Sequence, residues 1–264
     1  MGAAVLVSAR GVRINAIDRG AGDPVVFLHG IGGDAGNWAP QLEALAATHR
    51  VVALDSRGFG RSDRTYGRMS LADYARDVLV VMTELGIGRA PIVGLSMGGM
   101  IAQTVALTAP QRVASLVLAD TSSSADADMK ADLTASGAAA VAHGMPAVAT
   151  AFMPATFSRA AVAENRRYVR DFEENFSSTD PLTFNIGLQA IAELDLTDEL
   201  HRIDVPTLVL VGDEDALTPP EHSKTIASTV PGAELVVIDD AGHLSNLDQA
   251  GAFTEHLVRF LDAA

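Results

Sequence analysis

The sequence predicts an α/β protein built on a mostly parallel, eight-stranded sheet, with helices on both faces and a helical insertion after the sixth strand. Short runs rich in Val, Leu and Ile alternate with longer segments of helical periodicity over most of the 264 residues. This alternation is typical of a parallel sheet covered by helices. It stops between about residues 122 and 203, where several helical patterns follow one another.

The expected strands are continuous apolar runs, as is typical of strands buried on both faces of a sheet. The first two runs, at residues 4–9 and 12–18, are joined by a very short connection and are expected to form an antiparallel edge. The other expected strands occupy residues 24–30, 50–56, 90–96, 115–121, 206–213 and 233–240.

Helical signals fill the intervals between these strands. The segment 39–49 carries Pro40 in its first turn, and the segment 70–86 starts at the N-cap residue Ser70 and stops at Gly86. The other expected helices are 98–110, 220–230 and 249–263. We therefore expect a core of residues 1–121 and 204–264. Residues 122–203 are expected to form a helical cap over the carboxyl ends of the strands, where ligands of such sheets bind.

Composition narrows the class of protein. The formal net charge of −14 makes nucleic acid an unsuitable partner, and the lack of cysteine rules out disulfides, thiolate nucleophiles and Cys-based zinc sites. Neither a signal peptide nor a membrane span is recognisable in the sequence. We expect a soluble, cytoplasmic monomer or homodimer that acts on a small molecule without a metal or an organic cofactor.

A nucleophile turn is predicted at Gly94-Leu95-Ser96-Met97-Gly98, which fits G-x-S-x-G between an apolar strand and a helix. Small residues allow the sharp turn, and Ser96 is expected to project above the sheet. A serine hydroxyl needs a base to remove its proton. His243 follows a strand within a loop and is the preferred base, whereas His222 and His256 are expected to be surface residues.

The base needs an acid to orient it. Asp213, Glu214 and Asp215 end one strand, Asp120 ends another, and composition does not choose among them. Backbone amides are needed to bind the oxyanion of an acyl-transfer intermediate. Ile31, in the loop of residues 28–33, and Met97 are the expected donors. His29 is expected to support that loop.

Four separated motifs, HGIG, DSRGFGRSD, GLSMGG and GDEDALTP with AGH, appear in this order along the chain. With them the chain resembles the α/β-hydrolase fold family, which places its triad in the order Ser, Asp, His. The resemblance implies that Asp215 is the acid, through the spacing of Gly212, Asp215 and Pro219. GLSMGGMIAQ and AGHLSNLDQ are similar to the 3-oxoadipate enol-lactonase and carboxylesterase group, which implies cleavage of an ester or lactone through an acyl-enzyme.

Several alternatives share this fold. The same triad serves C–C bond hydrolases and cofactor-free haloperoxidases or perhydrolases, whereas the branch with an aspartate nucleophile is disfavoured because Ser96 occupies that position. A non-catalytic receptor for a small molecule is a further alternative. A dinucleotide enzyme is suggested by G-x-G-x-x-A at residues 30–35 with Asp55 beyond it. It is disfavoured because the following helix is expected to begin only near Pro40.

Substrate contacts are predicted from side-chain type. The apolar candidates are Trp38, Phe152, Phe157 and Phe184, for which core packing is the alternative role. Arg166, Arg167 and Arg170 would suit a substrate carboxylate. Their alternative role is to pair with acids such as Glu173 and Glu174.

Overall fold

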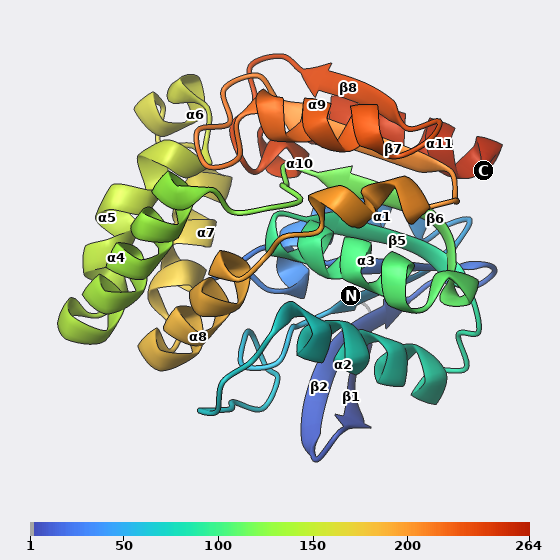
Figure 1. Ribbon diagram of the computed structural model, residues 1–264, viewed down its shortest axis with the longest axis horizontal. Coiled ribbons are helices and arrows are strands. Elements are labelled where there is room, and N and C mark those ends of the chain that lie inside the picture. The colour runs from blue at the N-terminus through green and yellow to red at the C-terminus, as the bar shows by residue number, and fades with distance from the viewer. Residues whose placement is uncertain (1–2) are drawn as a thin grey trace.

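The computed structural model describes residues 3–264, which form an eight-stranded sheet in the order β1-β2-β4-β3-β5-β6-β7-β8 (Figure 1). From β4 to β8 neighbouring strands run parallel, whereas β2 runs antiparallel to both of its neighbours. The strands are β1 (Ala3–Ala9), β2 (Val12–Arg19), β3 (Pro24–Leu28), β4 (Arg50–Leu54), β5 (Ala90–Leu95), β6 (Val113–Ala119), β7 (Thr207–Gly212) and β8 (Glu234–Ile238).

The antiparallel edge predicted at the start of the chain is confirmed. Strands β1 and β2 pair from Ala3 opposite Asp18 to Ala9 opposite Val12. Arg10 and Gly11, with φ of 49° and 83°, connect them. Positive φ at both central residues is what a two-residue turn matched to the twist of a hairpin requires.

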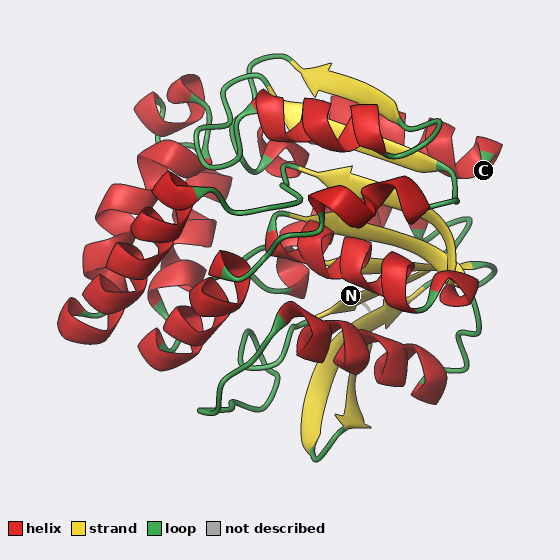
Figure 2. Ribbon diagram, in the orientation of Figure 1, coloured by secondary structure: helices red, strands yellow, loops and turns green. Residues whose placement is uncertain are grey.

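Helices cover both faces of the sheet. Helices α2, α3 and α9 lie on one face, and α1 and α11 lie on the other (Figures 1 and 2). The helices of the core are α1 (Ala39–Leu45), α2 (Leu71–Glu84), α3 (Met97–Thr108), α9 (Pro220–Thr229), α10 (Ser245–Asp248) and α11 (Ala250–Ala263), with 3-10 turns η1 (Ala35–Trp38), η2 (Pro110–Arg112) and η3 (Thr197–Arg202).

Buried apolar side chains fill the layers between sheet and helices. In the centre of the sheet Val26 pairs with Val52 on one side and Ile92 on the other, and all three are completely buried. Burying one such side chain contributes about 1.5–3 kcal/mol. This explains why the central strands read as continuous apolar runs in the sequence.

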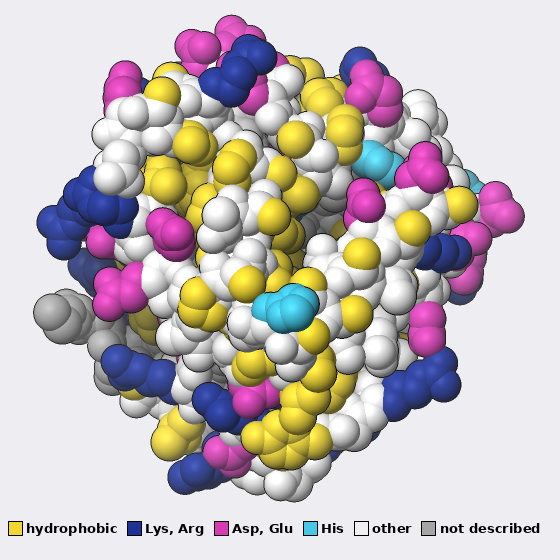
Figure 3. All heavy atoms as spheres, turned by 90° about the vertical axis from the view of Figure 1, so that its left-hand side faces the viewer, with side chains coloured by type: hydrophobic (Ala, Val, Ile, Leu, Met, Phe, Trp, Pro, Cys, Tyr) yellow, Lys and Arg dark blue, Asp and Glu magenta, His cyan; other side chains and the backbone are white. Residues whose placement is uncertain are grey.

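Helices α4 (Ala127–His143), α5 (Met145–Thr156), α6 (Arg159–Ala163), α7 (Arg167–Ser177) and α8 (Pro181–Ala192) separate β6 from β7. We call them the helical segment. Figure 1 shows this helical segment beside the carboxyl ends of the parallel strands. Figure 3 looks onto it, and hydrophobic side chains gather over the middle of that face.

The two ends of the helical segment are joined by backbone hydrogen bonds. Ser124 and Asp195 form an isolated antiparallel bridge. The amide of Ala125 donates to the Leu194 oxygen and the amide of Leu196 donates to the Ser123 oxygen, at 3.1 and 2.8 Å. The segment therefore leaves and re-enters the core at one place.

The core helices agree with the predicted bounds to within two residues, apart from two larger differences. The first helix ends at Leu45 instead of 49, because residues 46–48 turn back toward β4. The last expected helix is preceded by α10, which begins at Ser245. Among residues 3–264, no helix has both the length and the apolar character needed to cross a membrane.

Candidate active site

Ser96 is the single residue between β5 and α3. Its φ of 54° and ψ of −121° lie in a region that residues with a side chain rarely adopt. Hydrogen bonds on both sides hold it there, because its amide donates to the Ala119 oxygen at 2.9 Å and its own oxygen accepts from the Thr121 hydroxyl at 2.7 Å. Backbone strain over-determined in this way is typical of functional sites.

Glycines allow the strand, the turn and the helix to approach one another. A Cβ atom at Gly94 would lie 2.3 Å from the oxygen of Gly98, and one at Gly98 would lie 2.1 Å from the oxygen of Leu28. A Cβ at Gly99 would lie 2.8 Å from the side chain of Thr121. Any larger residue would therefore move α3 away from the sheet and displace Ser96.

His243 and Asp215 come together from the loops after β8 and β7. The Nδ1 atom of His243 lies 3.0 and 2.9 Å from the two carboxylate oxygens of Asp215. The Asp215 carboxylate is fixed in turn by the amides of Leu217 and Thr218 and by the Thr218 hydroxyl, all at 2.8–2.9 Å. With Nδ1 donating to the carboxylate, Nε2 of His243 keeps the lone pair that a general base needs.

The other candidate acids have different partners. Asp213 is exposed and accepts a 3.3 Å bond from the Ala241 amide, and Glu214 forms an ion pair with Arg159 at 2.8 Å. Asp120 is completely buried and binds the Gly212 amide and the Ser245 amide and hydroxyl. Of the four acids, Asp215 is the one that contacts His243.

Two pKa values in this cluster depart from the ordinary range. Burial raises the pKa of Asp120 to about 8; the charge of Asp215 adds to the rise, and His243 opposes it. Burial alone would lower the pKa of His243. The charge and hydrogen bond of Asp215, together with the charge of Asp120, raise the pKa above its usual value.

Ser96 and His243 line the same cavity. The Ser96 hydroxyl forms no hydrogen bond with any described residue, and its side chain is 6% exposed. Catalytic hydrogen bonds are often long before substrate binds. The free hydroxyl of Ser96 and the oriented imidazole of His243 therefore face the same cavity.

Of the expected oxyanion donors, Ile31 lines the cavity, whereas Met97 is not among the lining residues and follows Ser96 directly as the first residue of α3. Neither amide donates a hydrogen bond to another group in residues 3–264. His29 has both ring nitrogens engaged, because Nε2 accepts from the Ser56 amide at 2.9 Å and Nδ1 donates to the Gly30 oxygen at 2.7 Å. His29 therefore supports the loop, as the sequence interpretation expected.

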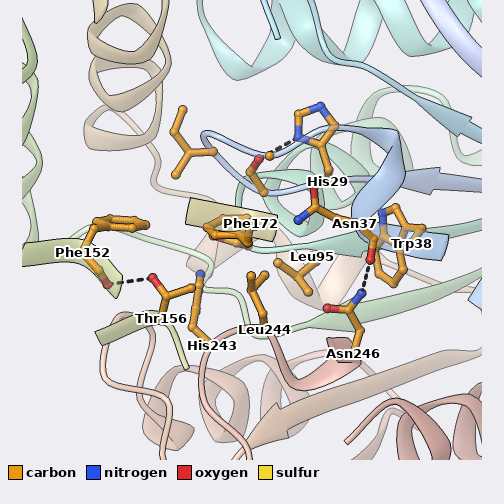
Figure 4. A pocket seen from close by; sticks show the side chains of 14 residues that line it. His29, Asn37, Trp38, Leu95, Phe152, Thr156, Phe172, His243, Leu244 and Asn246 are labelled. Atoms are coloured by element: carbon orange, nitrogen blue, oxygen red, sulfur yellow. Dashed lines mark hydrogen bonds between the residues drawn. The ribbon is translucent and has the colours of Figure 1, made fainter. Parts of the chain in front are cut away.

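The cavity has a small and a large compartment. The small one, of about 20 Å³, lies between the core and helices α5 and α7, and Figure 4 shows the side chains around it. Trp38 and Phe152 line it, as predicted. Phe157 and Phe184 do not line either compartment. This part of the prediction is wrong, because both rings are buried among the aromatic residues of the helical segment, where Phe157 contacts Phe172 and Phe184 contacts Phe176.

The arginines singled out for a substrate carboxylate lie elsewhere. Arg166 pairs with Glu164 at 2.8 Å and Arg167 pairs with Asp171 at 3.3 Å, whereas Arg170 donates to the Asn165 oxygen. None of the three lines the cavity. Pairing with nearby acids is therefore correct for Arg166 and Arg167, although their partners are not the two glutamates that the sequence suggested, and Arg170 binds a backbone oxygen instead.

The dinucleotide interpretation fails at Asp55. Its carboxylate accepts hydrogen bonds from the Asn15 side chain and from the amides of Ala35 and Arg61, all at 2.7–2.8 Å. These bonds hold the loops together and leave the carboxylate engaged within the protein. Residues 35–38 form a 3-10 turn, which starts nearer to the glycines than we expected, and α1 begins at Ala39.

Sequence reasoning missed Asp248. One of its carboxylate oxygens accepts from the amides of Ser158 and Gly242 at 2.7 and 2.8 Å, and the other accepts from the Tyr168 hydroxyl at 2.8 Å. Asp248 thus joins the helical segment to the loop that carries His243. Its partner Ser158 is 90 residues away, so the sequence offered no signal of this contact beyond the closeness of Asp248 to His243.

Comparison with known proteins shows the family to which the chain belongs. It matches the alpha/beta hydrolase fold family over residues 23–250, and it belongs to that family. It is 32% identical over 243 residues to a proposed carbamate hydrolase, RutD, of Azorhizobium caulinodans, with 91% of this chain and 92% of that protein aligned. These matches confirm the family resemblance drawn from the sequence.

Solved structures agree with this assignment. An esterase from Thermogutta terrifontis superposes with a TM-score of 0.93 at 30% identity and covers 99% of both chains. The enol-lactonase of Burkholderia xenovorans has a TM-score of 0.93 at 29% identity, covering 98% of this chain and 100% of its own. The protein is an α/β hydrolase, and the three relatives described above are named as a proposed carbamate hydrolase, an esterase and an enol-lactonase.

Proposed function

We propose that this protein is a serine hydrolase that cleaves a carboxylic ester or lactone of a small molecule through an acyl-enzyme. The observation that carries the proposal is the oriented His243, held on Asp215 at 2.9 Å, facing the cavity that also receives the free Ser96 hydroxyl. The names of the esterase and enol-lactonase relatives support the same class of reaction.

The proposed reaction begins when Nε2 of His243 takes the proton of Ser96 as its oxygen attacks the carbonyl carbon. The negative charge on the carbonyl oxygen is received by the amides of Ile31 and Met97; one such donor is worth about 3–4 kcal/mol of barrier. The C–O bond to the alcohol then breaks, and His243 gives its proton to the leaving oxygen. Water, activated by the same histidine, releases the acid and restores Ser96.

We further propose that residues 122–203 act as a cap over this site. Phe152 and Thr156 from α5 and Phe172 from α7 line the small compartment together with Leu95 and Leu244 of the core (Figure 4). A cavity walled by both parts keeps water away from the acyl-enzyme and shapes the acyl group that fits.

Hydrolysis of p-nitrophenyl acetate, a simple lactone and a carbamate ester tests the proposal. The unchanged protein should show a burst of p-nitrophenol equal to the enzyme concentration whenever deacylation is the slow step. Ser96→Ala should lose at least about a thousandfold in kcat. The matched control Ser228→Ala changes an exposed serine and should keep full activity. Equal activity of Ser96→Ala and the unchanged protein would overturn the proposal.

A further inference from the structure

The large compartment of the cavity, of about 490 Å³, is acidic at its outer end. It starts at Ser96 and His243 and is walled by α4 on one side and by Leu217 and Pro219 on the other. The charged side chains that line it, apart from its two histidines, are Asp126, Asp128 and Asp132. Within residues 3–264 no lysine or arginine lines it.

These three carboxylates have no cationic partner. All three are exposed, and none forms an ion pair with a described Lys or Arg side chain. Asp126 caps α4 by accepting from the Met129 amide at 2.8 Å. Lys130 lies between them in sequence but is not part of the cavity wall. Their charges therefore act on whatever occupies the opening.

At the inner end of the same compartment, Ser96 is a polar group that a ligand could bind. The residue Ser96 is 94% buried and lines the compartment, and its hydroxyl has no hydrogen-bond partner among the described residues. The small compartment on the other side of Ser96 has room for about one water-sized group beside the Ile31 loop. If the small compartment takes the acyl group, that group must be short, and the larger alcohol part of an ester extends toward the three aspartates.

We propose that the preferred substrates are esters of a short acyl group with an alcohol that carries a positive charge. This inference rests on the proposed serine hydrolase function and adds the chemical class of the alcohol. A charge-lined cleft with low-dielectric walls focuses the field on its occupant. The overall charge of −14 acts in the same direction. A cation is attracted to this opening, and a carboxylate meets three like charges without a counter-ion.

Three acetate esters of similar size separate the effect of charge from that of shape. Acetylcholine carries a cationic alcohol, 3,3-dimethylbutyl acetate is its neutral isostere, and 4-acetoxybutanoate carries a carboxylate. At low salt we expect kcat/KM to fall about tenfold from the cationic to the neutral ester and about tenfold again to the anionic ester. The ratios should shrink toward one in about 0.5 M NaCl, because salt screens exposed charges.

Variants assign the effect to the opening. The triple variant Asp126→Asn, Asp128→Asn, Asp132→Asn keeps the N-cap, since Asn caps as well as Asp. It should lose most of the charge preference, so that the ratio of kcat/KM between the cationic and the neutral ester falls toward one. The matched control changes Glu84→Gln, Glu255→Gln and Asp262→Asn, which are exposed and outside the cavity, and it should keep the preference.

The outcomes separate this inference from the proposed function. Equal kcat/KM for the three esters, or faster hydrolysis of the anionic one, overturns the inference and leaves the hydrolase intact. The same preference in both triple variants shows that net charge alone is responsible and also overturns it. Failure to hydrolyse any of the three esters or p-nitrophenyl acetate, or hydrolysis that Ser96→Ala leaves undiminished, overturns the proposed function and the inference with it.

Discussion

Replacement of Asp248 with alanine tests whether one carboxylate joins the helical segment to the loop that carries His243. The change removes three hydrogen bonds and leaves the buried amides of Ser158 and Gly242 and the Tyr168 hydroxyl without their acceptor. An unsatisfied buried donor costs about 1–3 kcal/mol, so the two amides alone give an expected loss of about 2–6 kcal/mol in the free energy of unfolding.

The same change should also slow catalysis. Gly242 precedes His243, and a shift of about 1 Å in a catalytic group costs up to about a hundredfold in rate. Urea unfolding followed by the fluorescence of the buried Trp38, together with kcat for p-nitrophenyl acetate, measures both effects. Tyr168→Phe removes one bond of the three and should cost about 0.5–1.5 kcal/mol.

Asp239→Ala is the matched control, because Asp239 is exposed, lies in the loop before His243 and forms no side-chain hydrogen bond with any residue of the described chain. It should leave both stability and kcat unchanged. If the free energy of unfolding of Asp248→Ala is within about 1 kcal/mol of that of the unchanged protein, the buried amides have found other partners and the prediction is wrong.

Three further changes test the site itself. Asp215→Asn should lower kcat by about 10³- to 10⁴-fold. It should also move the acidic limb of the pH–rate profile to lower pH, because activity needs neutral His243, whose raised pKa depends on Asp215; an unmoved limb would contradict the pairing. Asp120→Asn should keep activity at pH 7, because the pKa of about 8 leaves this carboxyl mostly protonated. The raised pKa also makes the unchanged protein lose stability as the pH rises from about 4 to 8, and urea unfolding of the Asn variant should not show this loss. Gly98→Ala should cost about 2–3 kcal/mol or more, since its Cβ would lie 2.1 Å from a β3 oxygen, and Gly88→Ala, with open space around it, should not.

The sheet could be predicted from the sequence because its strands are buried on both faces. A strand such as β3 must be apolar throughout, so its position is visible in the residue types alone. The nucleophile turn was equally visible, because G-x-S-x-G is a local pattern and Gly94 is dictated by its contact with Gly98, although Gly98 itself is dictated by contact with the distant Leu28. Local constraints of this kind leave a readable pattern.

The helices of the helical segment could be predicted from the sequence, but which of their side chains line the cavity could not. Phe157 and Phe184 have the same residue type as Phe152, and only the packing of α5, α7 and α8 decides which ring faces the cavity. His222 was expected at the surface, and it is half-buried and lines the large compartment. Such choices depend on the tertiary arrangement, which residue types alone do not encode.

Contacts between distant parts of the chain were also beyond sequence reasoning. The role of Asp248 depends on Ser158 and Tyr168, which lie in the helical segment. Asp120 and Asp215 both follow the carboxyl end of a strand, so their positions in the sequence are alike. Their hydrogen bonds differ, because Asp215 binds His243 and Asp120 binds Ser245. The family resemblance selected Asp215, because the spacing of Gly212, Asp215 and Pro219 matches the motif in which that family places its acid.

The most direct test of the account is to label the protein with a fluorophosphonate and to map the adduct by mass spectrometry. The reagent captures an activated serine, so we predict one adduct, on Ser96, that is absent in Ser96→Ala and forms much more slowly in His243→Ala. An adduct on any other residue, or undiminished labelling of Ser96→Ala, would contradict the claim that Ser96 is the nucleophile.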